Sequence, residues 1–124
     1  MTSASGPAAG PGPAVVIIPA HNEEGLIARA LEVLLADAGP GEFDVVVACN
    51  GCTDATADRA RQAAATLGLP VTVLSTPVAS KAAAIRAAEA VATGYPRVYL
   101  DADVECSTAT VRALVSAVER FRRR

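Results

Sequence analysis

The stretch FDVVVACNGCTDAT, residues 43–56, begins like a strand and ends in a loop that allows several chemistries. Residues 43–48 form a nearly continuous apolar run rich in valine, which is typical of a strand buried on both faces of a sheet. In the loop, Cys49 and Cys52 have the C-x-x-C spacing of a redox pair or of half a zinc site. Asn50-Gly51 and Thr53-Asp54 instead indicate a ligand-holding turn ahead of a helix. The cysteines alone do not decide between these interpretations.

The same order of strand and helix occurs four times along the chain. Strands are predicted over residues 14–18, 43–48, 71–74 and 97–101. Helices follow them, with predicted N-caps at Asn22, at Thr53 or Asp54, at Ser80, and at Ser107 or Thr108. Strict alternation predicts an α/β fold, a Rossmann-like parallel sheet of four β-α units with right-handed crossovers and helices on both faces.

The composition of this 124-residue chain suits one domain, with 52% hydrophobic and 19% charged residues. The domain is predicted over residues 14–121. Residues 1–13 are Gly, Pro and small residues, which bury little surface, so they are expected to form a disordered leader. A signal peptide pattern and an apolar run of membrane-spanning length are both missing. We therefore expect a cytoplasmic protein with reduced cysteines and no integral membrane segment.

The aromatic and charged residues restrict the classes of partner that the chain is expected to bind. The four aromatic residues do not form the repeated stacking surface that single-stranded nucleic acid requires, so no nucleic acid partner is expected. The net charge of −2 combines −6 over residues 1–119 with +4 from the arginines of residues 120–124. This basic end is interpreted as a solvated helix terminus in preference to a phosphate-binding or membrane-binding segment.

Polar side chains gather at the predicted carboxyl ends of the strands, where parallel sheets bind ligands. They are His21, Asn22 and Glu23 after the first strand, Asn50, Thr53 and Asp54, with the turn residue Gly51, after the second, and Asp101 and Asp103 after the fourth. Lys81 stands at the start of the third helix. Loops that only connect elements need turn-forming residues, not acids and amides at each end, so this segregation indicates a binding site.

Asp101-Ala102-Asp103 closes the fourth strand. Residues two apart in an extended chain face the same way, so both carboxylates can address one hard cation. Mg²⁺ or Mn²⁺ is the expected ion, because it is usually held by one or two carboxylates together with substrate phosphates. The alternative is that the two acids cap the helix that begins near Ser107.

Four segments together resemble the nucleotide-sugar-binding half of the family 2 glycosyltransferases with the GT-A fold. They are VVIIPAHNEEGLIARALEVLL (15–35), FDVVVACNGCTDATADRA (43–60), SKAAAIRAAEAV (80–91) and VYLDADVE (98–105). The resemblance implies a nucleotide-diphospho-sugar as ligand. It assigns nucleoside binding to Pro19, His21, Asn22 and Glu23 and to Asn50 and Asp54 in the second loop. It also places Lys81 near the diphosphate, Asp101 near the ribose or the metal, and Asp103 on the metal.

The second loop departs from the usual family pattern, in which two aspartates precede Gly-Ser-x-Asp and an acid contacts the base. Cys49-Asn50 stands in place of those two acids. Asn50 can still hydrogen-bond a base, but it carries both a donor and an acceptor. Cys49 and Cys52 are then interpreted as small residues that flank a nucleoside-binding turn. A zinc site made by His21, Cys49, Cys52 and Cys106 stays open as an alternative.

Transfer of a sugar with inversion needs a general base and a surface for the acceptor. In the resembled family both come from polypeptide after the D-x-D strand, and this sequence continues for only one more helix. We therefore expect donor recognition without the acceptor half. The sequence is interpreted either as a piece of a longer protein or as a subunit whose acceptor half a second polypeptide supplies. A non-catalytic nucleotide-binding remnant is the alternative function. A nucleotidyltransferase is disfavoured, because the segment PAHNEE (19–24) is not a Gly-rich phosphate loop.

Overall fold

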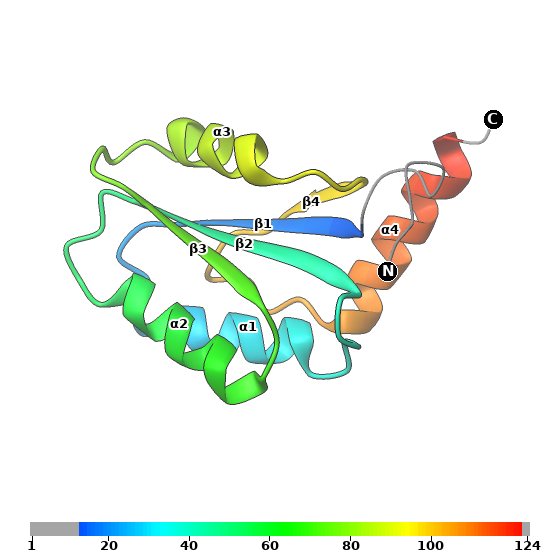
Figure 1. Ribbon diagram of the computed structural model, residues 1–124, viewed down its shortest axis with the longest axis horizontal. Helices are drawn as coiled ribbons and strands as arrows, with labels where there is room; N and C mark the ends of the chain where they lie inside the picture. The colour runs from blue at the N-terminus through cyan, green and yellow to red at the C-terminus, as the bar shows by residue number, and fades with distance from the viewer. Residues whose placement is uncertain (1–12, 123–124) are drawn as a thin grey trace, which may run out of the picture.

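The computed structural model describes residues 13–122 as one parallel sheet with helices on both faces (Figure 1). The strands are β1 (Ala14–Ala20), β2 (Phe43–Asn50), β3 (Val71–Thr76) and β4 (Arg97–Tyr99), in the order β3-β2-β1-β4. The helices are α1 (Ile27–Leu35), α2 (Thr56–Leu67), α3 (Lys81–Val91) and α4 (Thr108–Arg122). The predicted α/β fold is confirmed. Most of the predicted leader, residues 1–12, and the last two arginines lie outside the described residues.

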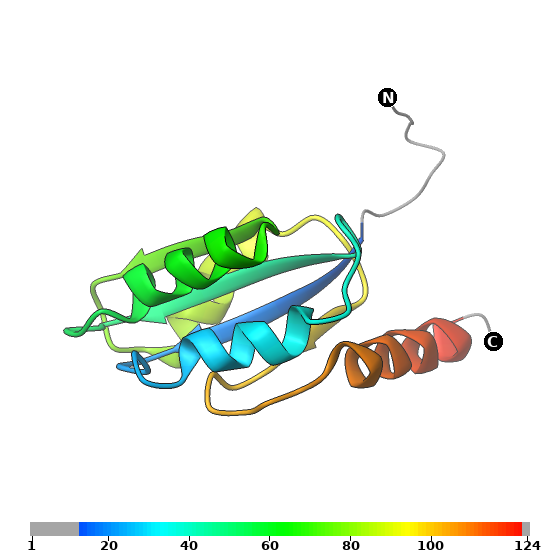
Figure 2. The same cartoon turned by 90° about the horizontal axis from the view of Figure 1, so that it is seen from below.

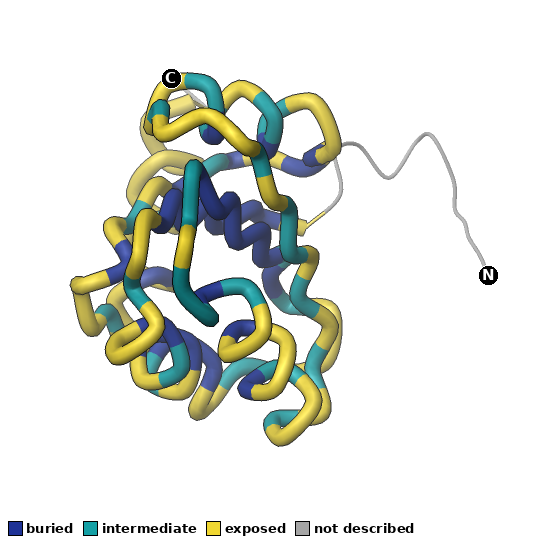
Figure 3. The backbone as a smooth tube through the Cα atoms, turned by 90° about the vertical axis from the view of Figure 1, so that its left-hand side faces the viewer, coloured by how far each residue is buried: buried dark blue, intermediate teal, exposed yellow. Residues whose placement is uncertain are grey.

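The two faces of the sheet pack against different helices, as Figures 1 and 2 show. On one face, alternate residues of β1 and β2 pack with α1, α2 and the start of α4; on the other face, the intervening residues pack with α3. Ala84 and Ala88 are the buried residues of α3, and their small side chains let this helix lie close to the sheet. Both central strands are therefore buried on both faces, which explains their apolar sequences. Figure 3 shows this buried centre inside an exposed shell.

Strand β1 is longer than predicted, since it continues through Pro19 to Ala20. Leu100 N donates to Ile17 O, so Ile17 presents its backbone groups toward β4. Pro19, two residues further on, presents its backbone to the same side. The pairing of β1 with β4 ends at Ile17 opposite Tyr99. The missing N–H of Pro19 therefore removes no ladder hydrogen bond, and proline does not end the strand.

The beginning of α1 also differs from prediction. Asn22 does not cap the helix, which starts at Ile27 without a side-chain cap. Asn22 instead has a positive φ of 50°, and its side chain turns toward the second loop. Among the other termini, Ser80 caps α3 and left-handed Gly68 ends α2, as predicted. Other boundaries differ from the predicted ones by a few residues. Helix α2 starts at residue 56 and not 54, and α3 ends at residue 91. Strand β3 continues to residue 76, and β4 stops at residue 99.

Helix α4 is anchored at its amino end and extends beyond the sheet (Figure 2). The buried Thr108 hydroxyl donates to Leu34 O at 2.6 Å. The guanidinium of Arg112 binds both carboxylate oxygens of Glu42, and this contact holds the pKa of Glu42 at about 2. Further along, the apolar face of the helix is largely exposed, at Leu114, Val118 and Phe121. No helix within residues 13–122 combines the length and the apolar character needed to cross a membrane.

Candidate functional site

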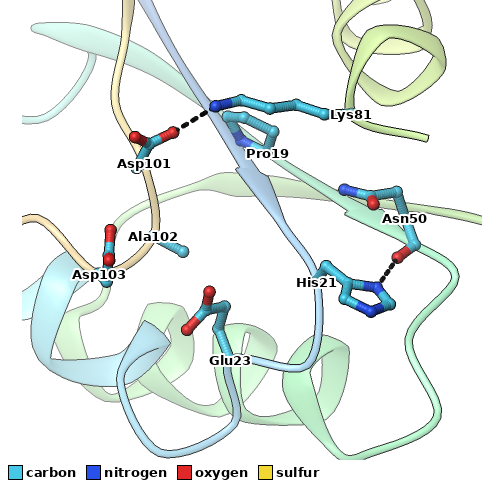
Figure 4. A pocket seen from close by; sticks show the side chains of 8 residues that line it. All are labelled: Pro19, His21, Glu23, Asn50, Lys81, Asp101, Ala102 and Asp103. Carbon is cyan, nitrogen blue, oxygen red and sulfur yellow. Dashed lines mark hydrogen bonds and ion pairs between the residues drawn. The ribbon is translucent and has the colours of Figure 1, made fainter. Parts of the chain in front are cut away.

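The strand order places a crevice beside β1. Chain order proceeds from β1 outward to β2 and β3, whereas β4 lies on the other side of β1, so strand order reverses there. Ligands of open α/β sheets bind beyond the carboxyl ends of the strands at such a point. A cleft of about 230 Å³ occupies this position (Figure 4). Its lining residues are Pro19, His21, Glu23, Asn50, Lys81, Asp101, Ala102 and Asp103. Of the residues that the family resemblance assigned to the site, all except Asn22 and Asp54 are among them.

One wall of the cleft is an ion pair between α3 and the segment after β4. Ser80 caps α3, so Lys81 begins the helix and its ammonium reaches Asp101 Oδ1 at 2.7 Å. Both side chains are more than half exposed, and an exposed pair contributes little to stability. The pair nevertheless places a cation and a carboxylate together in the lining of the cleft, as Figure 4 shows.

The two aspartates reach the cleft by a route other than the predicted one. The chain is not extended at residues 101–103, because β4 stops at Tyr99 and Val104 N donates to Asp101 O in a turn. The alternation of an extended strand therefore does not set the direction of the carboxylates. Asp101 and Asp103 still line the same cleft, on either side of the buried Ala102.

The opposite wall is built from His21 and Asn50. His21 Nδ1 lies 2.7 Å from the backbone oxygen of Asn50, which can only accept, so this ring nitrogen donates. The side-chain nitrogen of Asn50 donates to Ala20 O at 3.1 Å. These two bonds join the carboxyl ends of β1 and β2 and fix the imidazole beside the cleft.

Asn22 and Asp54, which do not line the cleft, connect the two loops that form it. Asn22 Oδ1 accepts from Thr53 N at 2.8 Å. Asp54 Oδ2 accepts from Glu24 N at 3.2 Å, and its other oxygen accepts from the amide and hydroxyl of Thr56. The Thr56 hydroxyl is the main reason that the pKa of Asp54 is lowered. In this arrangement both side chains serve loop geometry.

Thr56 is the residue that sequence reasoning missed. Its side chain is fully buried, and its hydroxyl accepts from Glu23 N at 2.8 Å while donating to Asp54. The backbone of the cleft residue Glu23 is thus held by the first turn of α2. The Asp54-x-Thr56 spacing, in which an aspartate bonds a backbone amide two residues on, is the signal in the sequence that indicates this turn.

The cysteines do not form a metal site in the described part of the chain. Cys49, Cys52 and Cys106 are free thiols, and residues 13–122 contain no group of three or more His, Cys, Asp or Glu side chains that could hold a metal ion. Cys49 packs in the core, and burial raises the pKa of its thiol to about 12. Cys52 lies 3.4 Å from Asn22 N and 3.6 Å from Ala20 O, between the two loops. Both residues therefore fill space around the turn.

A comparison with protein families agrees with this geometry. The model of the family described as glycosyl transferase family 2 matches residues 15–123. The chain belongs to glycosyltransferase family 2. No curated protein matches this family 2 chain significantly.

Three solved structures resemble the chain. A mannosyltransferase from Pyrobaculum calidifontis, in complex with GDP-Man and Mn²⁺, is 33% identical with a TM-score of 0.68, over 75% of this chain and 28% of its own. Glucosyl-3-phosphoglycerate synthase from Mycobacterium tuberculosis, in complex with Mn²⁺, UDP and phosphoglyceric acid, is 27% identical with a TM-score of 0.70, over 89% and 39%. TarS from S. aureus, at 22% identity and a TM-score of 0.75 over 87% and 32%, shares the fold. The family 2 chain thus spans less than half the length of each.

The residues of this family 2 chain fit a divalent cation. The carboxylates of Glu23, Asp101 and Asp103 line the cleft, and those of Asp101 and Asp103 lie on one turn and are hard oxygen donors of the kind that Mg²⁺ and Mn²⁺ bind. Residues 13–122 offer no third acid, histidine or cysteine in such a group. The remaining ligands would then be phosphate oxygens and water, which is the usual arrangement for Mg²⁺ at a nucleotide.

Proposed function

We propose that the cleft binds a nucleotide-diphospho-sugar together with Mg²⁺ or Mn²⁺, as the donor side of a glycosyltransferase. The observation that carries the proposal is the cleft at the reversal of strand order, where a lysine and two carboxylates lie opposite a histidine and a buried amide. Cation and carboxylates suit a metal-bound diphosphate, and the histidine and amide suit a base. The nucleotides and Mn²⁺ in the related structures support the same ligand class.

In this proposal, different residues of the cleft bind the base and the diphosphate. The His21 ring, held by its bond to the backbone of Asn50, offers a surface or a hydrogen bond for the base. Pro19 and Glu23 line the cleft between the base and phosphate regions. Lys81 supplies a positive charge for the diphosphate, and its exposed pair with Asp101 can open at small cost. In this proposal Asn22 and Asp54 act by shaping the loops.

Asp101 and Asp103 would hold the metal. A bound Mg²⁺ or Mn²⁺ supplies neutralisation of the negative charge that develops on the departing nucleoside diphosphate. Lys81, whose ammonium lies 2.7 Å from Asp101 Oδ1, would add a second positive charge that stabilises the leaving group.

We also propose that transfer requires an acceptor half from further polypeptide. Two surfaces of the described residues suit such a partner. Strand β4 pairs only with β1 in this part of the chain, which leaves its outer edge open to another strand. The exposed apolar residues of α4, at positions 114, 118 and 121, could pack against the same partner.

Calorimetry tests the donor site. We expect UDP-glucose or GDP-mannose to bind the chain about tenfold or more tightly with Mn²⁺ present, a difference of about 1.4 kcal/mol. Asp103→Ala should remove most of this dependence on metal because one of the two carboxylate ligands is lost. Equal affinity with and without Mn²⁺ would contradict the metal assignment, and no binding of either nucleotide-sugar would contradict the site.

Glu105→Ala provides the matched control. Glu105 is an exposed acid two residues further along, paired with Arg29 at 3.6 Å and outside the cleft lining. Its replacement removes the same charge from the same loop, so the dependence on Mn²⁺ should be unchanged. A loss equal to that of Asp103→Ala would mean that general electrostatics, and not coordination, explains the metal effect.

A further inference from the structure

The turn before α3, residues 77–80, carries Lys81 to the cleft. Lys81 is the first residue of α3, and its ammonium bonds Asp101 Oδ1 at 2.7 Å (Figure 4). Both side chains are more than half exposed, and an exposed ion pair holds a long side chain only weakly. The place that the ammonium can reach therefore depends on where the backbone of α3 begins, and residues 77–80 set that place.

This turn packs against Gly51 in the loop after β2. Gly51 N donates to Thr76 O at 2.9 Å, which continues the pairing of β2 with β3 by one residue beyond Asn50. At Gly51 a Cβ would lie 2.7 Å from the Cα, Cβ and N atoms of Ala79. Carbon atoms in contact stay about 3.5–4.0 Å apart. A side chain at position 51 and Ala79 in its present place therefore exclude each other.

Backbone conformation alone does not account for this glycine. Gly51 has a positive φ of 57°, and Gly68 at the end of α2 has a similar φ of 69°. A Cβ on Gly68 would meet nothing within 4 Å. The two glycines thus share the conformation that favours glycine, and at Gly51 the missing side chain also makes room for Ala79.

The contact with Ala79 is only two residues from Lys81, and the chain between them is held by hydrogen bonds. Ser80 N donates to Val78 O at 2.9 Å, and Ser80 Oγ accepts from Ala83 N in the cap of α3. Relief of the contact would require Ala79 to move by roughly 1 Å. Such a shift would move the capping residue, and with it the start of the helix.

We propose that Gly51 is a positioning residue for Lys81. By admitting Ala79 it sets the start of α3 at the point from which the ammonium reaches the diphosphate of the donor, and Gly51 itself needs no contact with the ligand. The inference rests on the proposed nucleotide site. A charged hydrogen bond displaced by about 1 Å is largely lost, so a side chain at position 51 should lower the affinity for a diphosphate by about tenfold or more.

Calorimetry in Mn²⁺ with UDP and UMP, or with GDP and GMP, measures this effect. Contacts with the base are common to both nucleotides of a pair, so the ratio of diphosphate to monophosphate affinity isolates the groups at the terminal phosphate. Gly51→Ala should lower this ratio by about tenfold. Gly68→Ala, the matched control for backbone strain, should leave it unchanged. A merely structural role of Gly51 would weaken both nucleotides alike, and an unchanged ratio in Gly51→Ala would overturn the inference.

Lys81→Met shows whether Gly51 acts through the ammonium. This variant removes the charge and keeps an unbranched side chain. In its background Gly51→Ala should lower the ratio by less than about twofold, because the contribution to be lost is already absent. A full tenfold loss in that background would mean that Gly51 acts on another group, and the inference would be wrong.

Two measurements do not require Gly51→Ala to fold. Ala79→Gly adds no clash and loosens the same contact from the other side, so it should lower the ratio a few-fold; no change would contradict the proposal. In the wild-type chain a strong nuclear Overhauser effect should join the α-protons of Gly51 to the protons of Ala79, and its absence would also contradict it. If neither UDP nor GDP binds the wild-type chain, the proposed function fails and this inference fails with it.

Discussion

Thr56→Val should destabilise the chain through a single lost hydroxyl, because valine has nearly the shape of threonine. The side chain is fully buried, so the variant creates neither a cavity nor new exposed surface. Two contacts are removed. Glu23 N loses the acceptor that lies at 2.8 Å, and the carboxylate of Asp54 loses its hydroxyl donor.

The magnitude follows from the amide of Glu23. A buried donor left without a partner costs about 1–3 kcal/mol. Glu23 is half-buried, so water can reach part of its backbone, and we expect the lower part of that range, about 1–2 kcal/mol. The contact with Asp54 adds a pH effect. The pKa of Asp54 is lowered mainly by the Thr56 hydroxyl, so its stabilising contribution is present above its unfolded pKa and is lost as pH falls through the folded pKa. In the variant this pKa should return toward its ordinary value, and that part of the acid dependence should shrink.

Urea denaturation followed by circular dichroism measures the effect, as a fall of the midpoint by roughly 0.5–1 M with an unchanged slope. Thr66→Val is the matched control on the same helix, since Thr66 is exposed and its side chain makes no hydrogen bond within residues 13–122. It should change stability by no more than about 0.5 kcal/mol. Thr56→Ser, which keeps the hydroxyl, should recover most of the loss. The reasoning fails if Thr56→Val is as stable as Thr66→Val.

Three other predictions concern a turn, a salt bridge and catalysis. Gly51→Ala should lower the free energy of unfolding, measured by denaturation, more than Gly68→Ala does. Both glycines have positive φ, but a Cβ on Gly51 would lie 2.7 Å from the backbone of Ala79, whereas a Cβ on Gly68 would meet open space. Equal losses of stability in the two variants would contradict this reasoning. The pKa of Glu42, lowered from 4.5 to about 2 chiefly by Arg112, makes this bridge stabilising above about pH 4.5 and predicts loss of stability as pH falls toward 2. Glu42→Gln should abolish that part of the pH dependence, and an unchanged acid profile would refute it. We propose that the general base belongs to the acceptor half, and such a base typically contributes about 10²–10⁴-fold, so the 124-residue chain should release nucleoside diphosphate only by slow hydrolysis; robust formation of a glycoside would show that these residues include a base.

The two central strands, β1 and β2, could be predicted because burial on both faces requires apolar sequences. The same reasoning ended β1 too early at Pro19, because the sequence does not reveal that β4 stops before the missing N–H would have been needed. It also placed a cap at Asn22, where the residue type is right for a cap but the side chain binds Thr53 across the loop. Local patterns thus identified the elements, and errors arose where a distant segment decided the outcome.

The candidate site was predictable as a group of residues and not as a set of roles. Polar residues at strand ends predicted most of the cleft lining, because the carboxyl ends of parallel strands meet at one edge. Asn22 and Asp54 carry the same kinds of polar atom as Asn50 and Asp101, yet their side chains join loops. Turn geometry and positive φ decide which way each side chain faces, and neither is encoded in residue type alone.

The two walls of the cleft differ in how firmly they are held. On the side of β2, the buried Asn50 and Thr56 bind the ends of β1 to β2 and α2 through hydrogen bonds to backbone atoms. On the side of β4, the exposed pair of Lys81 and Asp101 is the connection, and it is weak in water. A base that binds against the first wall meets side chains that are already held in place, so its binding requires little rearrangement of the protein. A diphosphate and its metal must instead separate Lys81 from Asp101 and engage each of them. We therefore expect base selectivity to be a property of the chain before any ligand binds, and the phosphate side to take its final arrangement with the ligand.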